Sequence, residues 1–312
     1  MPPVNVIAVI NQKGGVGKTT SVANLGAALA ARGHRVCLID MDPQSHLTLH
    51  MGVEIEPGST APTVYDMLTG EASLQDAAMV LPGRERLRLV PSVIDLAAAE
   101  VELAGTVGRE QILRERLAEA GDLGDYVLID CPPSLSVLTL NSLSAAQHVV
   151  IPLQPQFLAL QGLGKLLDTI RLVQQRINTS LRVAGVILCM YDSTTKLTGE
   201  VVAEVTDFFA AARDSRDPWA SATIFRAAIR RDIKLAECPS HGKTIFEYAP
   251  GTRGAEDYAA LAGELLDYFH PPAPEASPPP AEAAPPLPPP PPAPEPVDSV
   301  AQPALGDLDG AQ

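Results

Sequence analysis

The sequence predicts an α/β fold with a doubly wound, mostly parallel sheet and helices on both faces. Short apolar runs rich in β-branched residues alternate along the chain with longer stretches of helical periodicity, which is the order that parallel strands and crossover helices require. A glycine-rich turn separates the first apolar run from the first helical stretch. The 312 residues, 46% of them hydrophobic, suffice to build the core of one large domain.

The predicted elements follow one another in this alternating order. The expected strands span residues 4–10, 35–39, 87–90, 126–129, 148–151 and 183–190. The expected helices span residues 19–31, 92–103, 108–119, 136–146, 160–178, 198–212 and 255–269. In an open sheet of this kind, ligands bind beyond the carboxyl ends of the strands, so the segments that follow the strands are the candidates for chemistry.

The turn after the first strand has the composition of a phosphate-binding loop. Residues 11–20 read Asn-Gln-Lys-Gly-Gly-Val-Gly-Lys-Thr-Thr. The glycines let consecutive backbone N–H groups point inward around a polyphosphate, and the next helix presents its positive N-terminal end. Lys18 is expected to reach the β- and γ-phosphates, and Thr19 to ligate Mg²⁺. The order of strand, loop and helix favours this interpretation over a glycine turn with two solvated lysines.

Two other predicted strands lead into carboxylates. The second is followed by Asp40 and by Asp42, which precedes a proline, and the fourth is followed by Asp130. A carboxylate at this edge can orient a water in line with a phosphoryl group or hold Mg²⁺ through water. An Asp-Pro pair alone is often only a turn, so the interpretation depends on the phosphate loop being present in the same chain.

The loop departs from the pattern Gly-x-x-x-x-Gly-Lys-Ser/Thr, because Gln12 occupies the position of its first glycine and Lys13 adds a second lysine. This arrangement resembles the deviant Walker A motif of the ParA/MinD family of dimeric ATPases, and the likeness extends over about residues 4–269. The resemblance implies a P-loop NTPase fold, ATP and Mg²⁺ as cofactors, and a homodimer formed in ATP. It further implies that Lys18 acts in cis and that Lys13 crosses to the nucleotide of the partner subunit, while Asp42 positions the attacking water. The implied catalytic residues are Lys13, Lys18 and Asp42; the nucleotide-binding residues are Lys13, Gly14, Gly15, Val16, Gly17, Lys18, Thr19, Thr20 and Asp232; and the Mg²⁺ residues are Thr19, Asp130 and Asp42.

A basic segment near the end of the predicted sheet resembles the C-terminal block of chromosomal, Soj-like ParA proteins. Residues 229–243 read IRRDIKLAECPSHGK, and residues 226–243 hold five basic and two acidic side chains. Such a patch suffices for sequence-independent, salt-sensitive contacts with DNA phosphates, although on charge alone a solvated surface helix fits equally well. The implied DNA-binding residues are Arg231, Lys234, Arg230 and Lys196, the last replacing a family arginine that aligns with Thr194.

The overall composition limits the other functions. The formal net charge is −14, so DNA binding must come from a local patch. The four cysteines are widely spaced without a Cys-x-x-Cys pair, which is typical of reduced cytosolic thiols. There is neither a signal-peptide pattern nor a stretch of about 18 apolar residues. We therefore expect a cytoplasmic, nucleoid-associated protein that does not contact the membrane.

The last residues differ in composition from the rest of the chain. Residues 271–312 contain 16 of the 30 prolines and six acidic residues, but no Lys or Arg. Such a segment cannot bury enough apolar surface to offset the entropy of ordering, so polyproline II character and disorder are expected. The predicted organisation is an ATPase domain over residues 1–270 and a disordered, proline-rich acidic tail over residues 271–312.

Together these features predict a DNA-partitioning ATPase. Its ATP-bound sandwich dimer is expected to bind duplex DNA non-specifically, and a ParB-like centromere-binding partner to stimulate hydrolysis and release, which drives chromosome or plasmid segregation. An alternative is a relative that positions another cargo, such as a chemotaxis cluster or a microcompartment. A MinD-like membrane ATPase would need a basic amphipathic helix at its end, where this chain is acidic and proline-rich. Fe–S carriers and reductases are disfavoured by the absence of paired cysteines, and small-molecule ligases or kinases by the basic segment.

Overall fold

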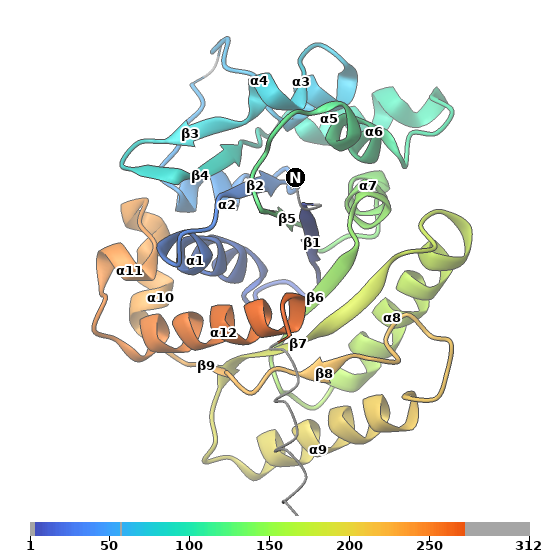
Figure 1. The fold of residues 1–312 in the computed structure, drawn as a ribbon, viewed down its shortest axis with the longest axis vertical. Coiled ribbons are helices and arrows are strands. Elements are labelled where there is room, and N and C mark those ends of the chain that lie inside the picture. Colours follow the sequence, from blue (N-terminus) through green and yellow to red (C-terminus); the bar gives the residue numbers. More distant parts are fainter. Residues whose placement is uncertain (1–3, 57, 272–312) are drawn as a thin grey trace, which may run out of the picture. The chain divides into compact units, whose positions relative to one another are not determined.

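The parallel sheet and its two helical layers are present in the computed structural model, which describes residues 4–56 and 58–271 (Figure 1). Within these residues the nine-stranded sheet has the order β3-β4-β2-β5-β1-β6-β7-β8, and β9 pairs with β7. Every pairing is parallel except that of β3 with β4. The strands are β1 Asn5–Val9, β2 Val36–Asp40, β3 Met79–Leu81, β4 Arg84–Val90, β5 Tyr126–Asp130, β6 His148–Leu153, β7 Arg182–Tyr191, β8 Thr223–Ile224 and β9 Ile229–Arg230.

The long helices lie where the sequence predicts them, and the additional ones are short. The predicted helices over residues 92–103 and 108–119 are wrong at their starts, because Ser92 and Gly108 lie in connections and the helices begin only at Leu96 and Ile112. The helices are α1 Lys18–Ala31, α2 His46–His50, α3 Val64–Thr69, α4 Leu74–Ala77, α5 Leu96–Glu102, α6 Ile112–Glu119, α7 Val137–Ala145, α8 Ala159–Arg176, α9 Lys196–Ala211, α10 Ile233–Glu237, α11 Ile245–Tyr248 and α12 Arg253–Phe269, with 3-10 turns η1 Leu103–Gly105 and η2 Cys238–His241.

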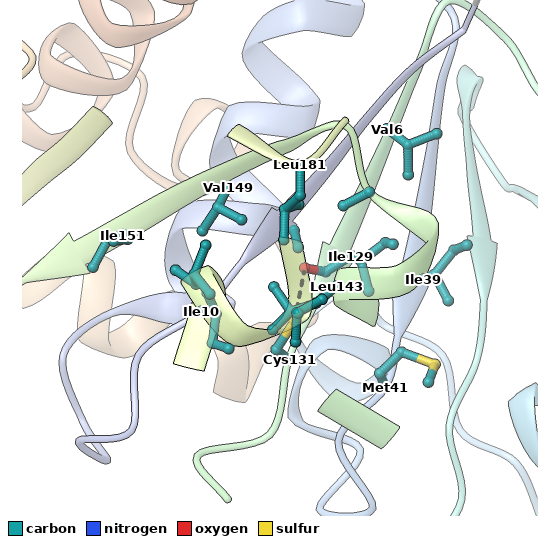
Figure 2. Packing of buried hydrophobic residues seen from close by; sticks show 14 of the residues in the cluster. Val6, Ile10, Ile39, Met41, Ile129, Cys131, Leu143, Val149, Ile151 and Leu181 are labelled. Carbon is teal, nitrogen blue, oxygen red and sulfur yellow. Dashed lines mark hydrogen bonds between the residues drawn. The ribbon is translucent and has the colours of Figure 1, made fainter. Parts of the chain in front are cut away.

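The core lies on both faces of the sheet because successive side chains of a strand point in opposite directions. In β1, Val6 and Ala8 face one apolar cluster, while Ile7 and Val9 face the other. The first cluster includes side chains of α3 and α5 to α9, and the second includes those of α1, α2 and α10 to α12. Figure 2 shows part of the first cluster, where Cys131 lies among Ile10, Ile129 and Leu143. This double burial explains why the central strands are almost entirely apolar.

The predictions for the proline-rich tail and for the cysteines have different outcomes. The predicted tail lies outside the described residues except for Pro271. The four cysteines are buried free thiols, and burial raises the pKa of Cys37, Cys131 and Cys189 to about 12. In residues 4–56 and 58–271, we find no helix with the length and apolar character needed to span a bilayer.

Arg84, the first residue of β4, joins three other segments of the chain. Its guanidinium donates to the carbonyl oxygens of Met51 and Gly242 at 2.9 Å each, and to the Glu247 carboxylate at 2.6 and 2.8 Å. Glu247 also accepts the backbone N–H of Thr244, completing a capping box at the start of α11. The Arg84 side chain is only 14% exposed and that of Glu247 is 38% exposed, so the bonds to the two carbonyls are better shielded from water than those to the carboxylate.

Replacing Arg84 by Ala is expected to destabilise the protein by about 2 to 3 kcal/mol, because two part-buried carbonyls and a carboxylate lose charged donors. Denaturant unfolding measures this loss. Arg86→Ala is the matched control on the same strand, since Arg86 is exposed and donates only to the carbonyl of Gly33; we expect its effect to be within about 0.5 kcal/mol. Equal effects of the two substitutions would contradict the role assigned to Arg84.

Candidate active site

The predicted phosphate loop connects β1 to the N-terminus of α1. Gly15 and Gly17 have φ of 71° and 92°, a left-handed conformation that side-chain-bearing residues seldom adopt. Gly17 is the N-cap of α1, and no side chain caps that end. Because α1 also carries no acidic residue in its first turn, its free N–H groups and positive dipole end remain available to an anion.

Lys18 is the buried cation of this loop. It is 7% exposed, and its Nζ lies 3.4 Å from the carbonyl oxygen of Lys13. Burial lowers the pKa of Lys18, while the charges of Asp130 and Asp42 act in the opposite direction. A buried ammonium without a close carboxylate gains from a phosphate placed beside it.

Two carboxylates face one another where β2 and β5 end. Asp40 and Asp130 are register partners in neighbouring strands and are both fully buried. Burial raises the pKa of Asp40 to about 7 and that of Asp130 well above its usual value, with the charge of Asp40 contributing second to the latter. Thr19 Oγ1 donates to Asp130 Oδ2 at 2.6 Å, and Asp130 Oδ1 has no partner within the described part of the chain. An orphaned, buried carboxylate oxygen beside a hydroxyl is a suitable donor pair for a hard cation.

Asp42 begins the loop between β2 and α2. Its side chain is 8% exposed, and its Oδ1 accepts the backbone N–H of Gln44 at 3.0 Å. The loop turns sharply at Ser45, whose φ is 56°. Asp42 thus lies on the same edge of the sheet as Lys18, as the sequence predicts for a residue that follows a parallel strand.

A cavity of about 790 Å³ opens over this edge and brings most of the predicted residues together. One wall is formed by the phosphate loop and the loop after β2, and the other by apolar side chains of β9 and α10. The predicted residues that line it are Gly14, Gly15, Gly17, Lys18, Thr19, Thr20, Asp42, Arg230, Arg231 and Asp232. Val16 lies in the core, and Asp130 reaches the cavity through its bond to Thr19.

The basic segment is less free than the sequence suggests. Arg230 donates to both oxygens of Asp257, the closest contact being 2.6 Å, and to Glu256 at 3.2 Å. This pairing holds β9 against α12 and engages the Arg230 guanidinium with two carboxylates. Arg231 is exposed and forms no ion pair within the described residues.

The other predicted residues lie around the cavity or apart from it. Asp232 caps the N-terminus of α10 by accepting the N–H of Lys234, and it also accepts the N–H of Gly254. Lys234 pairs with Glu237 at 2.8 Å. The side chain of Lys196 is 93% exposed at the start of α9, and Lys13 Nζ donates to Gln156 Oε1 at 2.5 Å. The glycine-rich and Asp-Pro patterns do not reveal Thr48 and Ser92, whose hydroxyls donate to the Asp40 carboxylate and to the Asp42 carbonyl.

His50, the last residue of α2, is fully buried. Neither ring nitrogen has a hydrogen-bond partner in the described region, and burial, with Arg84 second, lowers the pKa of His50 to about 4. Because the folded state binds this proton less well than the unfolded chain, His50 supports stability above pH ~6.5 and this support is lost as the pH falls towards 4. The loss amounts to about 3 kcal/mol at pH 4.

His50→Leu should flatten the pH dependence of the unfolding free energy over this range. His46→Gln, at an exposed position of the same helix, should leave it unchanged. Identical profiles for the unmodified protein and both variants would contradict the assignment of this pH dependence to His50.

Comparison with known proteins gives consistent matches. Residues 4–183 match the family model described as "AAA domain". The sporulation initiation inhibitor protein Soj of Bacillus subtilis is 45% identical over 260 residues, which cover 83% of this chain and 97% of that protein. The chromosome-partitioning ATPase Soj of Treponema pallidum is 43% identical, with 83% and 96% covered. A solved structure described as cobyrinic acid a,c-diamide synthase of Mycobacterium smegmatis, with bound ADP and magnesium, is 37% identical, covers 86% of this chain and 96% of that one, and has a TM-score of 0.70.

Proposed function

The chain belongs to the Soj/ParA family of chromosome-partitioning ATPases, and we propose that it hydrolyses ATP at the cavity between the phosphate loop and β9 to control its hold on DNA. One observation carries this proposal: the free N-terminus of α1, the buried ammonium of Lys18 and the Thr19 hydroxyl bonded to the buried Asp130 carboxylate converge on one cavity. That set is complementary to a polyphosphate with a divalent cation.

The residues fit ATP and Mg²⁺. Thr19 and Asp130 would hold the cation, with Asp42 nearby, and the few protein ligands suit Mg²⁺ because it usually retains waters and phosphate oxygens. Bound there, Mg²⁺ supplies charge neutralisation on the β- and γ-phosphates. The backbone N–H groups of residues 14–20 bind phosphate oxygens, and Lys18 neutralises their charge. Asp42 accepts a hydrogen bond from the attacking water and orients it in line.

Lys13 supports a dimer in which each subunit completes the site of the other. It projects from the loop, and within the described residues its Nζ is bound only to the neutral side chain of Gln156, so leaving that contact for a phosphate of the partner subunit costs little. We propose that ATP therefore closes a homodimer across the cavity, and that hydrolysis opens it.

DNA binding is assigned to Arg231, Lys234 and Lys196, with Arg230 as the anchor of the segment. Arg231 directly follows β9 and lines the cavity, and Lys234 lies in α10, which contributes apolar side chains to the same cavity, so nucleotide-driven dimerisation doubles the basic surface on one assembly. Because phosphate contacts are additive in charge and carry no sequence information, the dimer binds any duplex more tightly than the monomer. The proposal further includes a ParB-like partner and association with the nucleoid in the cell. For residues 271–312 it includes a role in tethering a partner or in keeping the protein soluble.

Arg231→Glu tests the DNA surface. We expect ATP affinity to stay within about 2-fold, while retention on duplex DNA at low salt falls at least about 10-fold, because one phosphate contact is replaced by repulsion. Arg213→Glu is the control: it makes the same change in net charge at an exposed position just after α9, at the opposite end of that helix from Lys196. Equal losses for both variants would mean that only net charge matters, and unchanged retention for Arg231→Glu would move the DNA site elsewhere.

A second candidate function is suggested by the Mycobacterium smegmatis structure, whose description names the synthesis of cobyrinic acid a,c-diamide. Stimulation of ATP turnover by cobyrinic acid, with no response to DNA, would favour it. The basic segment around Arg231 and the higher identity to chromosome-partitioning relatives favour partitioning.

A further inference from the structure

The loop that carries Asp42 is bound to the neighbouring strand through two hydroxyl side chains that no motif singles out. Thr48 donates from both its Oγ1 and its backbone N–H to Asp40 Oδ2, at 2.7 and 2.9 Å. Ser92 donates its backbone N–H to Thr48 Oγ1 at 2.9 Å, and its Oγ donates to the main-chain carbonyl of Asp42 at 2.8 Å. Asp40 Oδ1 accepts the N–H of Asp42 at 3.2 Å, which closes the network.

This network is shielded from water. Thr48 and Ser92 are each 2% exposed, and Asp40 is fully buried. Ser92 lies two residues beyond β4, which pairs in parallel with β2, so it reaches Asp42 from a different strand. The Thr48 hydroxyl uses its one donor on Asp40 and accepts from Ser92. Each bond is therefore made without competition from solvent, and the loss of either hydroxyl leaves a buried polar group unpaired.

We propose that Thr48 and Ser92 are positioning residues for ATP hydrolysis, which fix the main chain on both sides of Asp42 so that its carboxylate holds the attacking water in line. This inference rests on the proposed role of Asp42. The amide of Asp42 is held by Asp40, its carbonyl by Ser92, and Thr48 ties these two supports to each other. The carboxylate of Asp42 projects from a peptide segment held at both its N–H and its C=O.

Small displacements of a positioned group have large effects, since a shift of about 1 Å can cost about 100-fold in rate. Thr48→Val, which keeps the shape of the side chain, and Ser92→Ala are thus expected to lower the single-turnover rate of ATP cleavage about 10-fold to 100-fold. The dissociation constant for ATP should stay within about 2-fold, because Lys18 and the loop amides are untouched. Thr48→Ser keeps the hydroxyl and should restore most of the rate.

Two controls separate positioning from general loss of structure. Ser144→Ala removes a buried hydroxyl that has no partner within the described residues, so its rate should equal that of the unmodified protein. Combining Thr48→Val with Asp42→Ala should give the rate of Asp42→Ala alone, because a positioning residue has nothing left to position.

The outcomes separate the inference about Thr48 and Ser92 from the proposed role of Asp42 on which it rests. If Asp42→Ala abolishes cleavage while Thr48→Val and Ser92→Ala cleave ATP at the normal rate, the inference is wrong and the proposed function stands. If Asp42→Ala itself cleaves ATP normally, the proposed role of Asp42 is wrong, and the inference about Thr48 and Ser92 is overturned with it. Losses in ATP affinity and rate that parallel the fall in unfolding temperature, with no rescue by Thr48→Ser, would reduce Thr48 to a structural role and overturn the inference.

Discussion

Asp42→Ala is expected to lower the single-turnover rate of ATP cleavage by at least about 100-fold while leaving ATP binding, dimerisation and DNA retention in ATP intact. Phosphoryl transfer depends on positioning and charge stabilisation. Asp42 lies at the cavity edge, and in the part of the chain that the structure describes its carboxylate is bonded only to the backbone amide of Gln44. Its removal takes away the acceptor for the attacking water without touching Lys18 or Thr19. The measurement is rapid-quench cleavage with protein in excess, together with the mass of the complex in ATP.

Asp42→Asn is the matched control, because an amide oxygen can still accept the N–H of Gln44. If the carboxylate serves only to shape the loop, Asp42→Asn will cleave ATP at a normal rate. If its charge orients the water, Asp42→Asn will be nearly as slow as Asp42→Ala. If the Asp42→Ala protein is monomeric in ATP, the assignment of Asp42 to the attacking water is also contradicted, because Asp42 would then be needed for the dimer contact.

Lys13→Ala is expected to abolish dimerisation in ATP, raising the dissociation constant of the dimer at least about 100-fold. A charge-assisted bond to a phosphate, made in each half of a symmetric dimer, contributes about 1.5 to 3 kcal/mol per copy, and 100-fold corresponds to roughly 2.7 kcal/mol. ATP binding to the monomer should persist, because Lys18 and the α1 N-terminus remain. Sedimentation across a concentration series measures the constant.

Gln156→Ala shows whether the lysine acts within its own chain or across the dimer. In the structure Lys13 contacts Gln156 at 2.5 Å, so a purely internal role predicts that Gln156→Ala behaves like Lys13→Ala. A role across the dimer predicts that Gln156→Ala still dimerises in ATP. Loss of the dimer in both variants would therefore contradict the assignment of Lys13 to the partner's nucleotide.

The sequence predicts the central strands well because their signal is local. β1, β2, β5 and β6 are apolar on both faces, and each predicted boundary lies within two residues of the observed one. The short elements carry no such signal: α2, α4 and α10 have four or five residues, which is too few for a period of 3.6 to appear. β3 is exposed at the sheet edge at Val80 and has only three residues, which is too few for an alternating pattern to appear.

In the candidate site, too, the sequence predicts the residues that lie in local patterns and misses the contacts between distant segments. Gly17, Lys18 and Thr19 are consecutive in sequence, so their pattern reveals the loop directly, and Asp40 and Asp130 follow from the ends of apolar strands. The bonds from Ser92 to Asp42 and from Arg230 to Asp257 join residues 50 and 27 positions apart. Such contacts depend on which strands and helices pack side by side, and a single sequence does not show which elements become neighbours.

The central claim is that ATP controls the hold of this protein on DNA, and one measurement tests it most directly. Purified full-length protein is passed over immobilised duplex DNA of unrelated sequence in ATP, in ADP and without nucleotide, each across a series of salt concentrations. We expect retention only in ATP, with the logarithm of the binding constant falling linearly and steeply with the logarithm of salt. Equal retention in all three nucleotide states, or none in any, would contradict the claim.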